Sequence, residues 1–320
     1  MDCDYGLKTP LVSIIITTYN RSEYLSAAIE SALNQTYSNI EVIVVDDNNK
    51  GSDEAEFVEN LVSSYPGVKY LSTIKNSGAC VARNLGAQNA RGKFINFLDD
   101  DDLLLNSKIE KQIQKMNDLK ELHDNLPAAI GGFEEFIDSG GRIIGKRENR
   151  LKGNVFFENL CQSICQTSVP IIDRNTFLQA GGFGEIPSCQ EHYMFARLFS
   201  INPYYDYIDE SVVQIRHYDG PRISNGDKKI KGSKLLFEHF KNEYFGDLSF
   251  EEQKRVSCSM RENVISAFLL FNDRKGALEF YLKNRNVFYS MTKNITTLLQ
   301  ILLPKKAFSI LYKLFRKSTD

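Results

Sequence analysis

The fold of this chain can be predicted from the stretch Phe94-Ile95-Asn96-Phe97-Leu98-Asp99-Asp100-Asp101-Asp102-Leu103. Its first five residues are apolar except for one asparagine, which predicts a short strand buried on at least one face. The four aspartates therefore follow the carboxyl end of a strand, where open α/β sheets bind their ligands. Four adjacent carboxylates repel one another, and a divalent cation bound by their oxygens would offset this repulsion. The alternative is a solvated acidic turn before a helix that starts near Leu105.

The first hundred residues alternate between strand patterns and helix patterns. Apolar runs rich in β-branched residues predict buried strands at residues 11–17, 40–45, 68–72 and 94–98. Apolar residues at helical spacing predict helices at residues 25–33, 54–63 and 79–89, with Ser22 as the cap of the first helix. This order predicts an α/β fold with a mainly parallel sheet and helices on both of its faces.

After residue 120 the pattern becomes less regular. Strands are expected at residues 128–137, 142–146 and 211–217, and helices at residues 173–180 and 191–199. From about Lys231 onward the chain is expected to be helical, with a helical pair at residues 249–271 and 274–283. We therefore place a domain boundary near residue 230, between an α/β catalytic domain at 1–230 and a C-terminal helical region at 231–320.

The composition excludes several classes of protein. The 320 residues are 42% hydrophobic and 25% charged, which is ordinary for a soluble globular protein. The formal net charge of −2 argues against a nucleic-acid partner. Six cysteines in a chain of this length do not form a disulfide framework, and Cys161 and Cys165, at helical spacing, are expected in the core rather than on zinc. With no basic-then-apolar leader before Leu11, we expect a cytoplasmic protein with reduced thiols.

The C-terminus raises the question of membrane contact. Residues 294–303 are mostly apolar, but ten helical residues span roughly 15 Å, about half of the hydrocarbon core of a bilayer. Basic residues follow this run, at Lys305, Lys306, Lys313, Arg316 and Lys317. Two interpretations stay open: an interfacial helix on anionic lipid at the inner face of the membrane, or a terminal helix packed on its own domain or on a partner chain. The oligomeric state is open as well.

Polar side chains gather where the predicted strands end. They occupy residues 17–20, 46–48 and 99–102, and a fourth polar segment, at residues 83–84, lies in the predicted helix 79–89 at a position from which Arg83 could face the same edge. The carboxyl ends of parallel strands meet at one edge, so we expect a site with hydroxyl, aromatic, carboxylate and guanidinium groups there. The chain contains neither G-x-G-x-x-G after the first strand nor G-x-x-x-x-G-K-[ST]. A nucleotide held by these side chains and by a metal on the acidic turn is the interpretation that remains.

Five segments, taken in order, match one family. They are Pro10-Leu11-Val12-Ser13-Ile14-Ile15-Ile16-Thr17-Thr18-Tyr19-Asn20-Arg21, Glu41-Val42-Ile43-Val44-Val45-Asp46-Asp47, Asn76-Ser77-Gly78, Ala82-Arg83-Asn84-Leu85-Gly86 and Phe97-Leu98-Asp99-Asp100-Asp101. The set resembles the family 2 inverting glycosyltransferases with the GT-A fold, of the bacterial surface-polysaccharide type. Gly181-Gly182-Phe183 with Pro187-Ser188-Cys189-Gln190-Glu191 resembles the acceptor-side segment of that family. The resemblance covers residues 10–225 and implies a donor half at 10–125 and an acceptor half at 126–230.

The resemblance implies which residues bind the donor. Thr17, Tyr19 and Asp47 fall where the family contacts the nucleoside, with Tyr19 suited to stacking and Asp47 to a uracil imide. Arg83 falls where the family holds the base or the phosphates. The expected donor-binding set is Thr17, Tyr19, Asp47, Arg83, Asp99 and Asp100.

The resemblance also implies a metal. Asp99 and Asp101 are the outer members of the family's D-x-D motif, with Asp101 expected to touch the ion and Asp99 to lie nearer the ribose. Oxygen ligands and a diphosphate suit Mg²⁺ or Mn²⁺. Related enzymes often carry a histidine at the position of His217, which makes it a third candidate ligand; a solvated loop histidine is the alternative. Asp102 is an extra acid, expected either behind the metal ligands or in solvent.

Glu191 is the expected catalytic base, because the family places a carboxylate after the Gly-Gly-Phe segment, at the start of a helix. The family usually has an acidic pair where this chain has Gln190 and Glu191, so one base is kept and its acidic neighbour is lost. The alternative is a glutamate that only starts the helix.

These residues imply a divalent-metal-dependent inverting glycosyltransferase. It would move a sugar from a nucleotide diphosphate donor, with UDP as the expected nucleotide, to a hydroxyl of a glycan or lipid-linked glycan. The alternatives are a non-catalytic carbohydrate-binding or assembly scaffold with the same fold, and a sugar-nucleotide pyrophosphorylase. The latter would need a Gly-rich loop after the first strand, and Tyr19-Asn20-Arg21-Ser22 is not one.

Overall fold

A computed structural model describes residues 7–122, 125–217, 227–284 and 291–304. The chain divides into two compact units. The sheet unit comprises Met1–Asn159, Ser163–Glu185 and Gln190–Gly220, and the helical unit comprises Leu160–Gln162, Ile186–Cys189 and Pro221–Asp320. Each unit is described by itself below.

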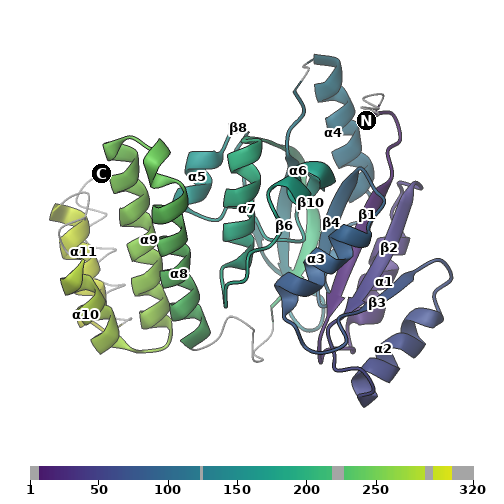
Figure 1. Cartoon of the computed structure of the whole chain (residues 1–320), viewed down its shortest axis with the longest axis horizontal. Helices are drawn as coiled ribbons and strands as arrows, with labels where there is room; N and C mark the ends of the chain where they lie inside the picture. Colours follow the sequence, from purple (N-terminus) through teal and green to yellow (C-terminus); the bar gives the residue numbers. More distant parts are fainter. Residues whose placement is uncertain (1–6, 123–124, 218–226, 285–290, 305–320) are drawn as a thin grey trace. The chain divides into compact units, whose positions relative to one another are not determined.

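The described residues of the sheet unit form one ten-stranded sheet (Figure 1). The strand order is β3-β2-β1-β4-β9-β6-β10-β5, with β7 beside β6 and β8 beside β10. The strands are β1 Val12–Thr18, β2 Ile40–Asp46, β3 Lys69–Ser72, β4 Phe94–Asp99, β5 Leu103–Leu104, β6 Ala129–Ile137, β7 Ile143–Arg147, β8 Gly153–Asn154, β9 Ile171–Asp173 and β10 Tyr204–Arg216.

Strands β1 to β4 form the parallel part of the sheet, as predicted. β1 pairs with both β2 and β4, and the register sets Thr17 opposite Asp99 and Thr18 opposite Asp46. β2 continues the same pattern to β3, with Asp46 opposite Ser72. The polar ends of these strands therefore lie level with one another at one edge, which confirms the predicted convergence.

Helices cover both faces of the parallel strands; Figure 1 shows α3 in front of them and α1 behind. The helices of this part of the chain are α1 Leu25–Leu33, α2 Asp53–Ser63, α3 Ala79–Asn89 and α4 Lys108–Leu122, of which α4 packs against β6 and β10 instead. Gly86 lets α3 lie close to β1, because a Cβ atom at this position would be 2.3 Å from Cγ2 of Ile15. The predicted Ser22 cap is wrong: Tyr24 occupies the N-cap of α1 and makes no side-chain cap.

The second half of the sheet is mixed rather than parallel. β9 is antiparallel to both β4 and β6, whereas β6 and β10 are parallel to each other. Three helices belong to this half of the sequence: α5 Phe156–Cys161, α6 Arg174–Gln179 and α7 Gln190–Ile201. Helix α5 ends at Cys161, so Cys161 and Cys165 do not share a helix face as predicted, although Cys165 is buried in the core.

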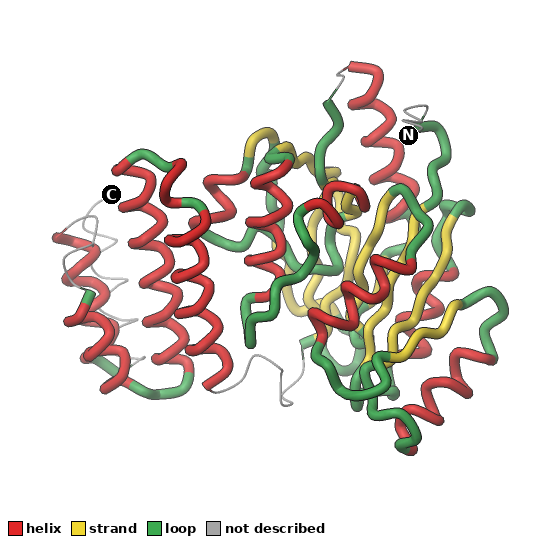
Figure 2. Tube along the Cα trace, in the orientation of Figure 1, coloured by secondary structure: helices red, strands yellow, loops and turns green. Residues whose placement is uncertain are grey.

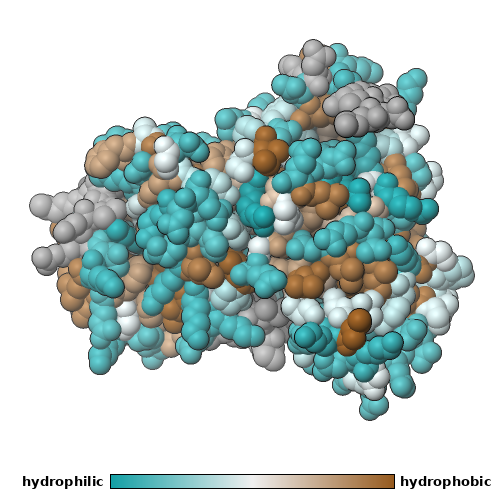
Figure 3. Space-filling model, viewed as in Figure 1, coloured by the Kyte–Doolittle hydropathy of each residue, from teal (hydrophilic) through white to brown (hydrophobic). Residues whose placement is uncertain are grey.

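The described part of the helical unit contains α8 Asp227–Glu243, η1 Phe245–Asp247, α9 Phe250–Leu270, α10 Arg274–Lys283 and α11 Met291–Leu302 (Figure 2). A capping box starts α9, in which Ser249 and Glu252 satisfy each other's backbone N–H groups. Cys258, Val264, Ile265 and Phe268 of α9 form a core with Ala277, Tyr281 and Ile301. Apolar side chains also remain exposed, including 76% of Phe250, and Figure 3 shows hydrophobic atoms between hydrophilic ones over this unit.

Within the described ranges, no helix has both the length and the apolar character needed to cross a bilayer. The basic residues on which the membrane hypothesis depends, Lys305, Lys306, Lys313, Arg316 and Lys317, lie outside these ranges.

Candidate active site

The four consecutive aspartates that follow β4 lie in different environments. The side chain of Asp99 is 35% exposed and that of Asp101 is 13% exposed, whereas Asp100 is 1% exposed. Asp102 is also buried, and its N–H donates to the carbonyl of Asp99 in a tight turn. The alternative of a solvated acidic turn is therefore wrong for Asp100 and Asp102.

Arginines supply the positive charge that the sequence led us to expect from a metal ion. Nη1 of Arg21 donates to Oδ2 of Asp101 at 2.6 Å, and Nη2 lies 2.9 Å from Oδ1 of Asp100. Nη2 of Arg83 donates to Oδ1 of Asp99 at 2.6 Å. The electrostatic argument for a metal is thus weaker than it seemed, because part of the repulsion is already offset by side chains of the chain itself.

Asp100 and Asp102 are buried acids. Burial raises the pKa of Asp100 to about 7, although Arg21 acts in the opposite direction. Burial, together with the charges of Asp99 and Asp101, raises the pKa of Asp102 well above its ordinary value. Asp102 accepts hydrogen bonds from Oγ of Ser168 at 2.9 Å and from the backbone N of Arg216 at 3.2 Å. It therefore joins the acidic run to the end of β10, and its predicted solvated role is wrong.

Asp47 organises the loop that leads into α3. Its carboxylate accepts hydrogen bonds from Oγ1 of Thr73 at 2.6 Å, from N of Ser77 at 2.9 Å and from N of Gly78 at 2.8 Å. A carboxylate offers about four acceptor positions, so these three bonds leave room for one more donor. The predicted contact of Asp47 with a base stays a prediction.

The two other predicted nucleoside contacts lie at the end of β1 and directly after it. Thr17 is buried at the end of β1, level with Asp99 in the neighbouring strand. Tyr19 is 37% exposed in the segment after β1, which leaves its ring accessible for stacking. The next residue, Asn20, has a φ of 51°, and its N–H donates to Oδ1 of Asn48 at 3.1 Å. The loops after β1 and β2 are thus tied together.

Arg83 joins the acidic run to the first turn of α7. Its guanidinium is buried, donates to Oε1 of Gln190 at 3.2 Å as well as to Asp99, and lies 5.2 Å from the ring centroid of Phe183. Burial opposes its charge, but Asp99 keeps the pKa of Arg83 above its ordinary value. Because Glu191 follows Gln190, the predicted base lies on the same turn that Arg83 holds.

A second contact holds the predicted acceptor-side segment against α3. Nδ2 of Asn84 donates to the carbonyl of Phe183 at 2.9 Å, and the N–H of Phe183 donates to Oδ1 of Asn84 at 2.8 Å. Gly182 allows this close approach, because its φ is 64° and an added Cβ would meet Oδ1 of Asn84 at 2.4 Å. The Gly-Gly-Phe turn and helix α3 are therefore held together.

His217 is held by its backbone and its ring. Its N–H donates to the carbonyl of Ile137 at 2.7 Å, and its ring packs edge to face on Phe136. Among the described residues, no group of three or more His, Cys, Asp or Glu side chains is arranged to hold a metal ion. His217 is therefore not gathered with Asp99 and Asp101 into a three-ligand site, and its metal role stays a prediction.

The two partly exposed aspartates nevertheless fit a divalent ion. Mg²⁺ is commonly bound by one or two carboxylates together with substrate phosphates and water, rather than by an all-protein cage. Asp99 and Asp101 offer such oxygens, while Asp100 and Asp102 face inward. These carboxylate oxygens therefore suit Mg²⁺ or Mn²⁺ that binds together with a diphosphate.

Sequence reasoning missed three residues of this site: Arg21, Ser168 and Arg216. Arg21 lies directly after Tyr19 and Asn20. A cationic residue next to a loop predicted to bind a ligand was the sequence signal that could have indicated it. Ser168 lies 66 residues from Asp102, and Arg216 lies 115 residues from Asp101, whose carbonyl accepts from its Nε at 3.3 Å. Nothing local in the sequence indicates these two contacts.

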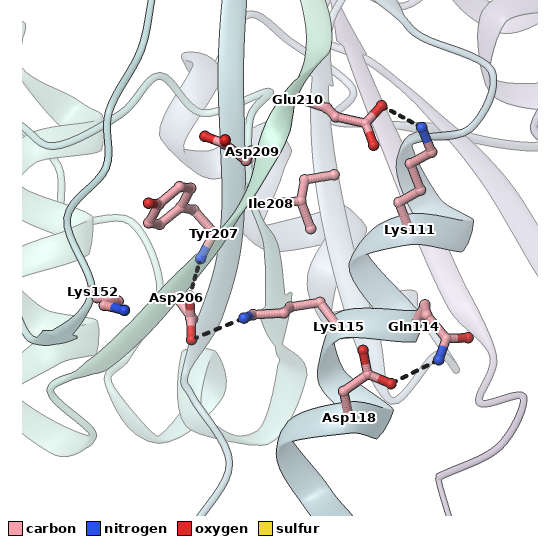
Figure 4. A pocket seen from close by; sticks show the side chains of 10 residues that line it. All are labelled: Lys111, Gln114, Lys115, Asp118, Lys152, Asp206, Tyr207, Ile208, Asp209 and Glu210. Atoms are coloured by element: carbon pink, nitrogen blue, oxygen red, sulfur yellow. Dashed lines mark hydrogen bonds and ion pairs between the residues drawn. The ribbon is translucent and has the colours of Figure 1, made fainter.

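A cavity of about 450 Å³ lies elsewhere in the sheet unit, between α4 and β10 (Figure 4). Charged residues of both signs line it, and Nζ of Lys115 lies 3.6 Å from Oδ2 of Asp206. The register of β10 against β6 shifts between Tyr207 and Ser211 beside it. None of the predicted site residues lines this cavity.

Known proteins resemble this chain in sequence. The model of "Glycosyl transferase family 2" matches residues 13–162. An uncharacterized glycosyltransferase of Rickettsia prowazekii is 33% identical over 284 residues, which cover 86% of this chain and 84% of that protein. The Escherichia coli UDP-Glc:alpha-D-GlcNAc-diphosphoundecaprenol beta-1,3-glucosyltransferase WfgD is 34% identical over 194 residues, or 60% of this chain and 71% of that protein.

Other relatives are longer than this chain, and solved structures have a similar fold. The chain spans 42% of an uncharacterized glycosyltransferase of Rickettsia felis, to which it is 32% identical over 265 residues. The crystal structure of S. aureus TarS 1-349 in complex with UDP-GlcNAc superposes with a TM-score of 0.53 at 16% identity, covering 89% of this chain and 90% of that one. This likeness concerns the fold.

Proposed function

Because the chain belongs to glycosyl transferase family 2 and has the GT-A fold, we propose that it transfers a sugar from a nucleotide diphosphate donor to an acceptor hydroxyl with inversion. The donor we propose is a UDP-sugar, and the acceptor a glycan or lipid-linked glycan. WfgD, by its name, uses UDP-glucose and a diphosphoundecaprenol-linked sugar, and TarS was crystallised with UDP-GlcNAc. Both names support this choice of substrates.

One observation carries the proposal: Arg83 touches both Asp99, on the donor side, and Gln190, next to the proposed base. The groups proposed to bind the donor and to activate the acceptor are thus joined by one set of contacts, which supports a direct displacement.

In the proposed mechanism, Glu191 accepts the proton of the acceptor hydroxyl. The oxygen then forms its bond to the anomeric carbon while the bond to the diphosphate breaks on the opposite face. A positioned base contributes on the order of 10²–10⁴-fold to the rate. A divalent ion on Asp101 and Asp99 would, when bound, offset the charge of the leaving diphosphate. Tyr19 and Asp47 orient the nucleoside in this scheme.

The base is tested with Glu191→Gln, and the matched control is Glu185→Gln, an exposed acid six residues upstream. We expect Glu191→Gln to lower transfer by at least 100-fold, on the order that a lost general base implies, and to leave UDP affinity unchanged. The control should keep normal turnover. A loss of UDP binding in Glu191→Gln would instead assign this residue to the donor side.

The donor side is tested with Asp101→Asn. Transfer in the presence of Mn²⁺ should collapse while the thermal unfolding curve keeps its wild-type shape. A variant with near-normal turnover would refute the metal assignment. Screening UDP-, GDP- and dTDP-sugars for metal-dependent binding would identify the nucleotide, and a protein that binds glycan but releases no UDP from any donor would support the scaffold alternative.

A further inference from the structure

We propose that Arg21 is a built-in counter-cation of the acidic run, with which a divalent ion must compete at Asp101. The inference rests on the proposed function, because it assumes that Asp101 is a metal ligand. It gives a role to a residue to which neither the sequence motifs nor the comparisons assign one. It also implies that the chain itself lowers the affinity of the site for metal.

The geometry of Arg21 carries the first step. Its guanidinium reaches two neighbouring carboxylates at once, with Nη1 at 2.6 Å from Oδ2 of Asp101 and Nη2 at 2.9 Å from Oδ1 of Asp100. One arm of this guanidinium fork makes a charge-assisted hydrogen bond with Asp101, and the other makes an ion pair with Asp100. Arg21 thus occupies one oxygen of Asp101 and places its positive charge beside any ion that binds the other oxygen.

The burial of the three side chains decides which contact can open. Asp100 is 1% exposed, so water cannot take the place of Arg21 beside it, and separating the two would leave a buried acid without its cation. Asp101 is 13% exposed and Arg21 is 31% exposed, so the outer half of the fork lies at the surface. The contact with Asp101 can therefore exchange for a metal ion while the contact with Asp100 remains.

The exchange has a direct consequence for binding order. A divalent ion would approach an oxygen of Asp101 to about 2.1 Å, where two cations on one oxygen repel each other. Metal alone has to compete with the Arg21 contact, whereas metal with a diphosphate brings two further negative groups that compensate a released guanidinium. The protein should therefore bind metal weakly by itself and much more tightly with the nucleotide, and nucleotide binding must gain from metal by the same factor.

The test measures Mn²⁺ binding directly, from the electron paramagnetic resonance signal of free Mn²⁺, with and without UDP. It compares the wild type with Arg21→Gln and with the control Arg216→Gln. Arg216 contacts the same turn, but its Nε donates to the backbone carbonyl of Asp101 at 3.3 Å rather than to a carboxylate. The control therefore removes a like charge nearby without freeing a metal ligand.

Without UDP, we expect Arg21→Gln to bind Mn²⁺ roughly threefold to tenfold more tightly than the wild type, as the loss of a partly exposed charge-assisted pair implies. Arg216→Gln should change the affinity by less than about twofold. UDP should strengthen Mn²⁺ binding less in Arg21→Gln than in the wild type. Arg21→Lys, which keeps the charge but loses the fork, should lie between the two, and circular dichroism of each variant confirms folding.

Three outcomes would overturn the proposal. Unchanged or weaker Mn²⁺ binding in Arg21→Gln would show that Arg21 does not compete with the ion. An equal gain in Arg216→Gln would assign the effect to charge at a distance. If neither the wild type nor any variant binds Mn²⁺, even with UDP, the metal-dependent part of the proposed function fails together with the role of Arg21. If the wild type binds Mn²⁺ with UDP and the variants do not differ, only the role of Arg21 fails.

Discussion

Replacing Arg83 with lysine would separate the charge of this residue from its shape. Arg83 uses two nitrogens for two partners, with Nη2 on Asp99 at 2.6 Å and Nη1 on Gln190 at 3.2 Å. A lysine keeps the positive charge but has one ammonium group, so it can hold one partner and must release the other. It also loses the flat contact with the ring of Phe183.

The magnitude follows from which contact is lost. Asp99 is 35% exposed, so water compensates part of any loss on that side. The hydrogen bond to Gln190 and the contact with Phe183 are shielded, and their loss should lower the free energy of unfolding by about 1–2 kcal/mol. Each kcal/mol corresponds to about 2–4 °C of melting temperature in a domain of this size. Turnover should fall by about tenfold, because the turn that bears Glu191 loses its tether.

Urea unfolding followed by circular dichroism measures the stability of Arg83→Lys, since the chain contains no tryptophan to report by fluorescence. Arg91→Lys is the control: the Arg91 side chain is 78% exposed and pairs with Glu41 at the surface. The control should change stability by less than about 0.5 kcal/mol. An unfolding free energy for Arg83→Lys within the same margin, or an equal loss in Arg91→Lys, would refute the assignment of Arg83 as the joint between donor and base.

Two further substitutions test the packing of each unit. Nζ of Lys108 is buried against Oε1 of Gln112 at 2.7 Å, and burial lowers the pKa of this amine well below 10.5. The unfolded chain therefore binds a proton that the folded one lacks, so stability should rise with pH between the lowered pKa and 10.5. Lys108→Met should remove this slope, and parallel slopes in urea unfolding from about pH 6 to pH 9 would contradict this. The substitution also leaves Oε1 of the buried Gln112 without its donor, which should cost about 1–3 kcal/mol. In the helical unit, a Cβ atom at Gly232 would be 2.7 Å from N of Ser188, whereas one at Gly246 meets nothing within 4 Å. Gly232→Ala should therefore lower stability by about 1–2 kcal/mol relative to Gly246→Ala in thermal melts. Equal melting temperatures would show that α8 shifts to accommodate the added Cβ atom.

The sequence predicted the parallel half of the sheet well, because each strand there is a continuous apolar run that ends in polar residues. β9 could not be predicted, since Ile171–Asp173 is too short to show a period and gains its pairing only from β4 and β6. β10 begins seven residues before the predicted strand at 211, and the register shift after Tyr207 breaks the alternation that would have revealed it.

The candidate residues of the site could be chosen from the sequence, but the charge balance around them could not. The acids, Tyr19 and Glu191 could be chosen because a motif marks each of them. The contacts that hold these residues could not be predicted, since Arg21 lies 80 residues from Asp101 and Arg83 lies 107 residues from Gln190. A local sequence pattern does not reveal such distant pairs. The run of four aspartates therefore led us to expect a metal, although arginines already supply part of the compensating charge.

The short strand β9 has a consequence for anyone who wishes to dissect this molecule. It hydrogen-bonds to β4 on one side and to β6 on the other, so the parallel strands and the later ones share a single sheet. A fragment cut near residue 125 would lose the strand that covers β4, whose unpaired backbone N–H and C=O groups, flanked by apolar side chains, would then be open to a second copy. Such a truncation is therefore expected to precipitate during expression rather than to yield a small nucleotide-binding domain.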